Sequence, residues 1–172
     1  IQAMSLTVET RDPYTAGHQR RVAALACAIA EQMGLPPDLI DAVRMAGTIH
    51  DIGKMSVPAE ILSKPTRLVA AELNLIRAHS QAGYDILKDA GLPHPIADIV
   101  LQHHERLDGS GYPQGLHGTD ILLGAAVLAV ADIVEAISSH RPYRPALGIA
   151  AALAEIEQNC DILYHGDAAR AC

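Results

Sequence analysis

PDLIDAVRMAGTIHDIG, residues 37–53, has the pattern of an amphipathic helix that runs directly into a histidine and an aspartate. Ile40, Val43 and Gly47 recur at helical spacing, and the next position on the same face is His50. The face that packs inward therefore carries an imidazole at its end, with the carboxylate of Asp51 beside it in sequence. The stretch predicts a helix that ends in a buried polar pair.

The combination of an apolar helical face with a histidine or an aspartate recurs in four other stretches. In each of them the apolar residues and the histidine or aspartate together fall on one helical face, at positions mostly three or four residues apart. The faces are His18, Val22, Leu25 and Ile29, ending at Gly34 before Pro36 and Pro37; Leu75, His79, Ala82 and Ile86 within residues 70–91; Ile96, Ile99, Val100 and His103; and Ala125, Leu128, Asp132 and Ala136. No segment alternates with a period of two, so the sequence predicts an all-α fold.

Length and composition fit a single domain with one hydrophobic core. The chain has 172 residues, is 49% hydrophobic and contains neither Trp nor Phe, so the core must consist of Ala, Leu, Ile and Val. The net charge of −7 argues against binding to bulk nucleic acid or to anionic membranes. The sequence opens in a helical pattern, and we expect residues 1–172 to be one domain excised from a longer sensor or regulator protein.

The sequence predicts neither a membrane span nor a disulfide framework. The longest apolar stretch, residues 121–137, is interrupted by Asp132 and Glu135, too early for a span of about 20 residues. Cys27, Cys160 and Cys172 are odd in number and lack zinc-like spacing. They fit packing thiols in a reducing compartment, so we expect a cytoplasmic location.

Seven histidines and aspartates lie on the inward faces or directly beside them. A single histidine on an apolar face is more often a hydrogen-bonded core residue than a ligand. Seven unpaired groups, however, would each cost roughly several kcal/mol, and divalent metal ions remove this cost by turning the groups into ligands. The set is His18, His50, Asp51, His79, His103, His104 and Asp132. It is too large for one ion and suits two, with Asp51 as the natural bridging carboxylate.

The donor types narrow the choice of metal. No cysteine belongs to the set, and nitrogen and oxygen ligands favour iron or manganese, with zinc and nickel as alternatives. The sequence therefore predicts a helical bundle with a buried dinuclear metal site.

HHERLDGSGYP, residues 103–113, joins two of these histidines to a glycine-rich loop that ends at a proline. Together with HDIGK at residues 50–54, it resembles the signature of the HD-domain phosphohydrolases. More narrowly, it is similar to the HD-GYP subfamily of cyclic di-GMP phosphodiesterases. The similarity spans Asp12 to Arg144 and implies an HD-domain helical bundle with a catalytic role.

The resemblance also implies how the ligands are divided. A first ion would be held by His18, His50, Asp51 and Asp132, and a second by Asp51, His79, His103 and His104. Some members of the family look trinuclear and have an acidic residue one helical turn before the position of His18. Tyr14 occupies that position here, which favours two ions over three.

Four further residues are candidates for binding the substrate. Lys54 lies one turn beyond His50. Two cations would repel its ammonium unless an anion such as phosphate lay between them. The alternative is a surface lysine at a helix C-terminus. Arg141 and Arg144 suit bidentate binding of phosphate, the role that the resemblance also implies, unless they lie on a solvated loop. Tyr112 can stack on a guanine or contact a ribose, unless its loop merely joins two helices.

The predicted activity is two-metal hydrolysis of cyclic di-GMP to linear pGpG, with GMP as the product of a second cut. Asp51 and Lys54 are the predicted catalytic residues, because the first holds both ions and the second neutralises charge on the reacting phosphate. The alternatives are a metal-bound module that binds the dinucleotide and signals without turnover, and a general HD nucleotide phosphohydrolase. The resemblance adds a diguanylate cyclase-domain partner at the loop, and the oligomeric state, including a homodimer, stays open.

Overall fold

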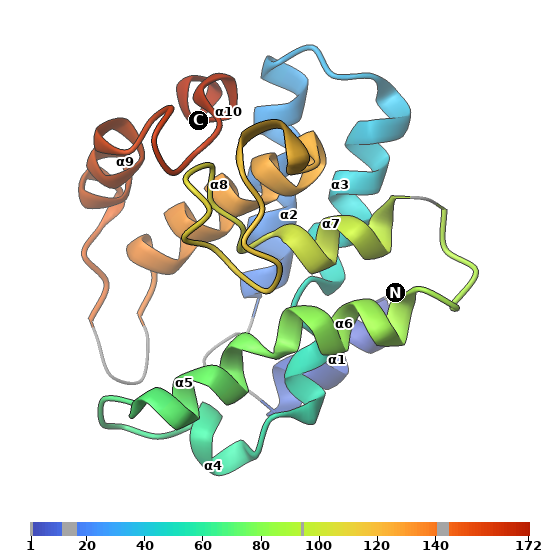
Figure 1. The fold of residues 1–172 in the computed structure, drawn as a ribbon, viewed down its shortest axis with the longest axis vertical. Helices are drawn as coiled ribbons and strands as arrows, with labels where there is room; N and C mark the ends of the chain where they lie inside the picture. The colour runs from blue at the N-terminus through green and yellow to red at the C-terminus, as the bar shows by residue number, and fades with distance from the viewer. Residues whose placement is uncertain (1, 12–16, 94, 141–144) are drawn as a thin grey trace.

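The computed structural model describes residues 2–11, 17–93, 95–140 and 145–172, and Figure 1 shows a bundle of helices. The elements are α1 (Gln2–Arg11), α2 (His18–Gln32), α3 (Pro37–Ile49), η2 (Ile52–Ser56), α4 (Ala59–Leu62), α5 (Ala70–Arg77), α6 (His79–Leu87), α7 (Ile96–Gln102), η3 (Gly118–Asp120), α8 (Leu123–Ser138), α9 (Ile149–Gln158) and α10 (Gly166–Ala171), where η marks a 3-10 helix. Two isolated β-bridges are the only β pairing among the described residues. The all-α prediction is confirmed.

Helix α8 is the centre of the hydrophobic core. It packs against α2, α3, α7, α9 and α10, and in Figure 1 it lies in the middle of the molecule. Every residue from Gly124 to Asp132 is buried, because this stretch is apolar almost all round and other helices cover it on several sides. The core contains mainly Val, Ile, Leu and Ala, as the composition predicts.

Helices α2 and α3 begin and end close to the predicted positions. Helix α2 ends at Gln32, and Gly34 follows with a φ of 67°, a left-handed conformation that glycine adopts without strain. Helix α3 begins at Pro37 and ends at Ile49, so His50 is its C-terminal cap. The polar pair therefore lies at the end of a buried helix.

The predicted single helix over residues 70–91 is wrong. The chain breaks at Ala78 into α5 and α6, and Leu75 and Ile86, predicted to face inward, are 49% and 43% exposed. The buried residues of α6 are His79, Ser80, Gly83 and Leu87, and α5 has none. The apolar spacing thus ran across the break and combined two helices that have different buried faces.

A close contact between η2 and α6 fixes the turn after His50. A Cβ atom at Gly53 would lie 1.9 Å from the carbonyl oxygen of His79 and 2.5 Å from the amide nitrogen of Gly83. Only glycine allows two backbone segments to approach this closely. The contact therefore sets the position of the Asp51 turn relative to the first turn of α6.

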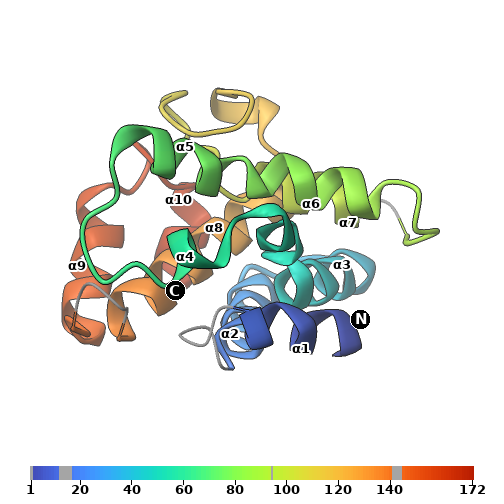
Figure 2. The ribbon, with the colours of Figure 1, turned by 90° about the horizontal axis from the view of Figure 1, so that it is seen from below.

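Helix α1 packs against α3 and η2, and Figure 2 shows it beside α2 and α3 with α5 and α6 on the opposite side of the view. In the part of the chain that the structure describes, no helix has the length and apolar character needed to cross a membrane.

Candidate metal centre

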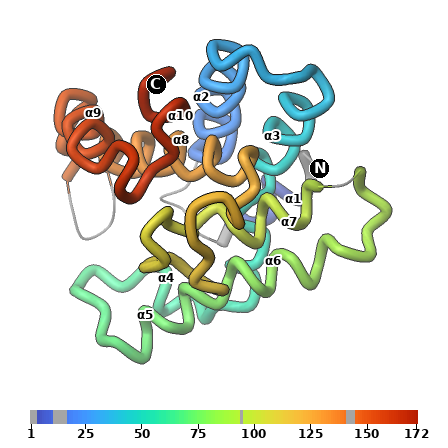
Figure 3. Tube along the Cα trace, turned by 45° about the horizontal axis from the view of Figure 1, so that its top comes forward, coloured from blue at the N-terminus to red at the C-terminus, as the bar shows by residue number. Residues whose placement is uncertain are grey.

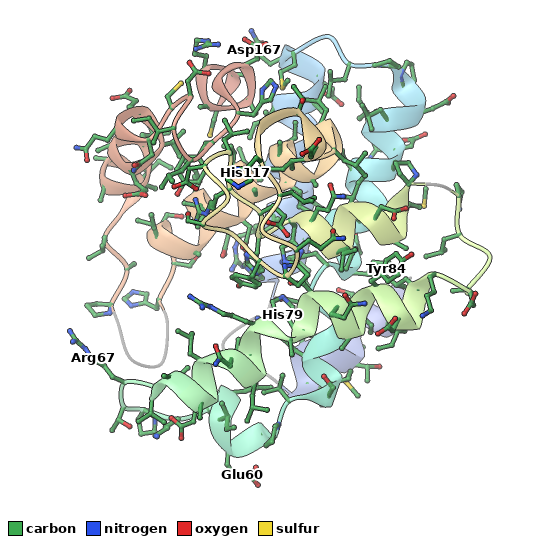
Figure 4. The ribbon with its side chains drawn as sticks, in the orientation of Figure 1. Glu60, Arg67, His79, Tyr84, His117 and Asp167 are labelled. Carbon is green, nitrogen blue, oxygen red and sulfur yellow. The ribbon has the colours of Figure 1, made fainter. Side chains whose placement is uncertain are left out.

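The fold brings the seven predicted ligands together. His18 is the first residue of α2, His50 and Asp51 follow α3, and His79 is the first residue of α6. His103 and His104 follow α7, and Asp132 lies in α8. Six of the seven are buried, with exposed fractions of 8% or less, and His104 is partly buried. Figure 4 shows His79 in the interior, whereas Glu60 and Asp167 lie at the periphery.

The five imidazole rings form a continuous cluster. The ring centroid of His50 lies 5.3 Å from that of His18 and 5.2 Å from that of His103. The ring centroid of His79 lies 5.4 Å from that of His103 and 5.1 Å from that of His104, and the last two are 4.0 Å apart. Residues from four helix ends thus meet in one place.

Three of the rings are oriented in the same way. The Nδ1 atoms of His50, His79 and His103 lie 2.8, 2.7 and 2.6 Å from the carbonyl oxygens of Gly47, Ile76 and Val100. A carbonyl only accepts a hydrogen bond, so Nδ1 carries the proton and Nε2 presents a lone pair.

These lone pairs have no hydrogen-bond partner within the described ranges. The Nε2 atoms of His50, His79 and His103 are buried and unpaired, and an unpaired buried polar atom costs about 1–3 kcal/mol. Burial, together with the neighbouring rings, lowers the pKa of His103 to about 3, so this ring is neutral at neutral pH. Neutral imidazoles with converging lone pairs are the form in which histidine binds a metal ion.

Asp51 faces both halves of the cluster. Its Oδ2 atom lies 3.8 Å from His18 Nε2 and 3.7 Å from His50 Nε2, and its Oδ1 atom lies 3.5 Å from His79 Nε2. Burial raises the pKa of the carboxyl, but the ammonium of Lys54, 2.8 Å from Oδ2, and the nearby histidines outweigh burial and hold the pKa well below its usual value. The carboxylate is therefore ionised, with each oxygen near a different set of histidines, as a bridging ligand requires.

The remaining atoms complete two groups of ligands. Asp132 Oδ1 lies 3.3 Å from His18 Nε2 and 3.8 Å from His50 Nε2. The ligand atoms of His18, His50 and Asp132 lie within 4.8 Å of one another, and so do those of His79, His103 and His104. A third group at the same spacing, His50, Asp51 and His103, links the two. With Asp51 between them, the two trios fit two divalent ions held by nitrogen and oxygen.

The cluster borders a cavity of about 250 Å³, which is lined by His18, Asp51, Lys54, Ile76, His79, His104, Tyr112, Asp132, Ile133 and Ala136. Two of the predicted substrate residues, Lys54 and Tyr112, thus line the same cavity as five of the seven predicted ligands. The Tyr112 ring centroid lies 4.7 Å from that of His104, and the guanidinium of Arg77 lies 5.3 Å from the Tyr112 ring centroid. Arg77 was not predicted, and its position two residues before His79 gave no distinctive signal.

Comparison with known families agrees with this geometry. The family model described as HD domain matches residues 2–167. The chain belongs to the HD domain family.

Two curated relatives of this HD domain act on cyclic dinucleotides according to their names. A cyclic di-GMP phosphodiesterase of Pseudomonas aeruginosa is 44% identical over 147 residues, which are 85% of this chain and 36% of the relative. A 3′3′-cGAMP-specific phosphodiesterase of Vibrio cholerae is 40% identical over 159 residues, which are 92% of this chain and 35% of the relative. The chain therefore spans little more than a third of the length of either relative.

A solved structure shows the same fold. A protein from Bdellovibrio bacteriovorus, described as an HDG"Y"P protein, has a TM-score of 0.73 at 19% identity, over 90% of this chain and 49% of that chain. The family match begins nearer the N-terminus and ends nearer the C-terminus than the motifs from Asp12 to Arg144 indicate.

The structure adds Glu135 to the centre of the HD domain. The Glu135 carboxylate is 6% exposed and forms a hydrogen bond with Nδ1 of His18 through Oε2. Burial opposes protonation of His18, but the hydrogen bonds with Asp132 and Glu135 outweigh it and raise the pKa of His18 to about 9. The sequence offered one signal for Glu135: it is a second acid three residues after Asp132, on the same face of an otherwise apolar helix.

The loop after α7 folds around another buried acid, Glu105, which the sequence pattern did not indicate. Glu105, 3% exposed, accepts hydrogen bonds from the backbone amides of Gln114 at 2.7 Å and Leu116 at 3.0 Å. A Cβ atom at Gly111 would lie 2.5 Å from the Cα atom of Glu105, so the loop passes close to its own first turn. This path carries Tyr112 back to His104. In Figure 3 the loop lies between α8 and the α5–α6 pair.

Arg141, Arg144 and Tyr14 lie outside the described residues, so the phosphate contacts and the preference for two ions stay predictions.

Proposed function

We propose that this HD domain is a phosphodiesterase that hydrolyses cyclic di-GMP at a centre of two divalent ions, the activity that its HD-GYP motifs predict. The observation that carries the proposal is the set of three buried, unpaired Nε2 atoms around the ionised carboxylate of Asp51. The names of the two relatives support a cyclic dinucleotide as the substrate.

The ligands of the two ions follow from the two trios. We assign His18, His50 and Asp132 to one ion, His79, His103 and His104 to the other, and Asp51 to both. The absence of thiolate from this set favours iron or manganese, with zinc and nickel as alternatives.

Hydrolysis adds water across the bond between phosphorus and the 3′ oxygen: oxygen joins phosphorus, a proton goes to the leaving 3′ oxygen, and linear pGpG results. Divalent ions, when bound, supply Lewis acidity that activates water and neutralises phosphate charge. The ammonium of Lys54 lines the cavity beside Asp51, and we assign it to the non-bridging phosphate oxygens, where negative charge develops. A second cut of pGpG would yield GMP.

The size of the cavity indicates how the substrate enters. Its 250 Å³ is below the range of about 300–1,000 Å³ typical of ligand pockets, so we assign only the reacting phosphodiester to it and place the bases at its mouth. Tyr112 on the wall is then available to a base or a ribose, and we assign Arg141 and Arg144 to the second phosphate.

A substrate screen tests the proposal. Protein reconstituted with Mn²⁺ or Fe²⁺ is incubated with cyclic di-GMP, 3′3′-cGAMP and nucleoside monophosphates, and the products are separated by chromatography. We expect pGpG from cyclic di-GMP and no activity in Asp51→Ala, because that variant loses a ligand of both ions. Hydrolysis of monophosphates alone would support a general phosphohydrolase, and binding of cyclic di-GMP without product would support a signalling module.

Three features of the biological setting stay predictions: contact of the loop with a diguanylate cyclase domain, a homodimer, and a location in the cytoplasm. The three cysteines are free thiols, which is compatible with a reducing compartment.

A further inference from the structure

Four of the five imidazoles of the centre are oriented by two kinds of acceptor. His50, His79 and His103 donate Nδ1–H to backbone carbonyls, whereas Nδ1 of His18 is hydrogen-bonded to the carboxylate of Glu135. A carbonyl is a neutral dipole, and a carboxylate carries a full negative charge. Both fix the ring, but the carboxylate also strengthens Nε2 as an electron donor to a metal ion.

Glu135 is itself held in place. Its Oε1 atom accepts hydrogen bonds from Arg21 Nε at 2.9 Å, from Arg21 Nη2 at 2.5 Å and from Ser139 Oγ at 2.7 Å, while Oε2 faces His18. The Arg21 side chain is 48% exposed and the Glu135 side chain only 6%, so solvent screens the guanidinium more than the carboxylate. The carboxylate therefore keeps a substantial electrostatic effect on His18.

The two ligand trios also differ in their own charge. The trio of His18, His50 and Asp132 includes a carboxylate, whereas His79, His103 and His104 contribute three imidazoles. Asp51 is common to both sides. Glu135 adds a second carboxylate to the His18–Asp132 side, and Arg21 offsets only part of its charge, so a divalent cation is attracted more strongly there.

We propose that Glu135 is a positioning residue that makes the His18–Asp132 side the tighter of two unequal metal positions. The proposal rests on the dinuclear centre proposed above and adds an order of loading: the His18–Asp132 side fills first and empties last.

A chelator competition on the loaded protein tests this order. Protein loaded with Mn²⁺ is equilibrated with increasing concentrations of a chelator, and the Mn²⁺ that stays bound is measured by elemental analysis after removal of small molecules. We expect the parent protein to lose its two ions in two steps. In Glu135→Gln the tighter step should weaken by about 10–100-fold, the usual effect of removing a carboxylate behind a metal-bound histidine, and the weaker step should not change.

Two variants separate charge from packing. Glu135→Asp keeps the charge but moves it away from His18, so it should recover part of the affinity that Glu135→Gln loses. Ser139→Ala removes one hydrogen bond of Glu135 but leaves its carboxylate on His18, so both steps should stay close to those of the parent. Equal losses in the Gln and Asp variants would assign the effect to packing and overturn the proposal.

The remaining outcomes distinguish failure of this proposal from failure of the proposed function. A loss shared equally by both steps in Glu135→Gln, or two equal steps in the parent, would overturn the proposal while leaving the proposed function intact. A parent with two unequal steps and no phosphodiesterase activity would refute the function alone. If Glu135→Gln does not fold, as judged by circular dichroism, Glu135→Asp decides: weakening confined to the tighter step supports the proposal, and any other pattern overturns it.

Discussion

Replacing Gly53 by alanine should both destabilise the domain and reduce its metal content. The added Cβ atom would lie 1.9 Å from the carbonyl oxygen of His79 and 2.5 Å from the amide nitrogen of Gly83. Both atoms belong to the backbone of α6, so no side-chain rotation relieves the overlap. Either η2 or the first turn of α6 must move, and the first turn of α6 carries His79.

The magnitude follows from the cost of overpacking. Inserting a methylene into a packed core costs about 1–3 kcal/mol, and contact with backbone on both sides argues for the upper end. For a domain of this size each kcal/mol lowers Tm by about 2–4 °C, so a loss of about 3 kcal/mol corresponds to about 6–12 °C. The φ of Gly53 is not in the left-handed region, so the whole effect is steric.

Gly91 provides the matched control. It has a φ of 67°, and a Cβ atom added to it would meet no atom within 4 Å, so Gly91→Ala costs about 1–2 kcal/mol through the backbone alone. Thermal unfolding and elemental analysis of both variants separate the two effects. Gly53→Ala should lose Tm and metal, whereas Gly91→Ala should lose some Tm and retain metal. A Gly53→Ala protein with the parent Tm and two bound ions would refute the reasoning.

Three further predictions follow from the centre and its loop. A chelator should lower Tm, because ions that bind only the native state stabilise it by about 2.7 kcal/mol at 100 times their Kd; an unchanged Tm would argue against a bound metal. Glu105→Ala should speed hydrogen exchange at the amides of Gln114 and Leu116, which lose their acceptor, and unchanged exchange would show that other contacts hold the loop. Arg141→Ala or Arg144→Ala should raise KM more than it lowers kcat, since both are assigned to a phosphate remote from the reacting one; unchanged kinetics would place them on a solvated loop.

The burial of several candidate ligands could be predicted from the sequence because these residues interrupt an apolar helical pattern. Asp132 lies in a stretch that is otherwise buried all round, and His103 continues the face of Ile96, Ile99 and Val100. Burial of such a residue follows from the periodicity alone, whichever helices it later meets. The same reasoning was wrong where a helix was interrupted: periodicity across Ala78 predicted burial of Leu75 and Ile86, which are exposed.

The contacts behind the ligands could not be predicted in this way. His18 and Glu135 are 117 residues apart in the sequence, and their hydrogen bond depends on how α2 packs against α8. The contact of the Arg77 guanidinium with the Tyr112 ring likewise depends on the path of the loop that Glu105 holds. Helical periodicity indicates which face is buried but not which side chain of another helix lies opposite.

The position of three candidate ligands nevertheless has a simple cause in helix geometry. The last carbonyls of an α-helix have no donor within the helix. His50 and His103 directly follow α3 and α7, and His79 follows the end of α5 by two residues. Each donates Nδ1–H to the carbonyl three residues earlier, in the last turn of the helix that precedes it.

This hydrogen bond serves the helix and the ring at once. The helix end gains a donor, and the ring gains a fixed tautomer whose Nε2 points away from its own helix. Because α3, α5 and α7 end near the same point, the three lone pairs converge there, unpaired and buried. The carboxylate of Asp51, the candidate bridging ligand, belongs to the turn that Gly53 allows against α6. The candidate metal centre is therefore determined largely by where the helices end and only secondarily by the loops that join them.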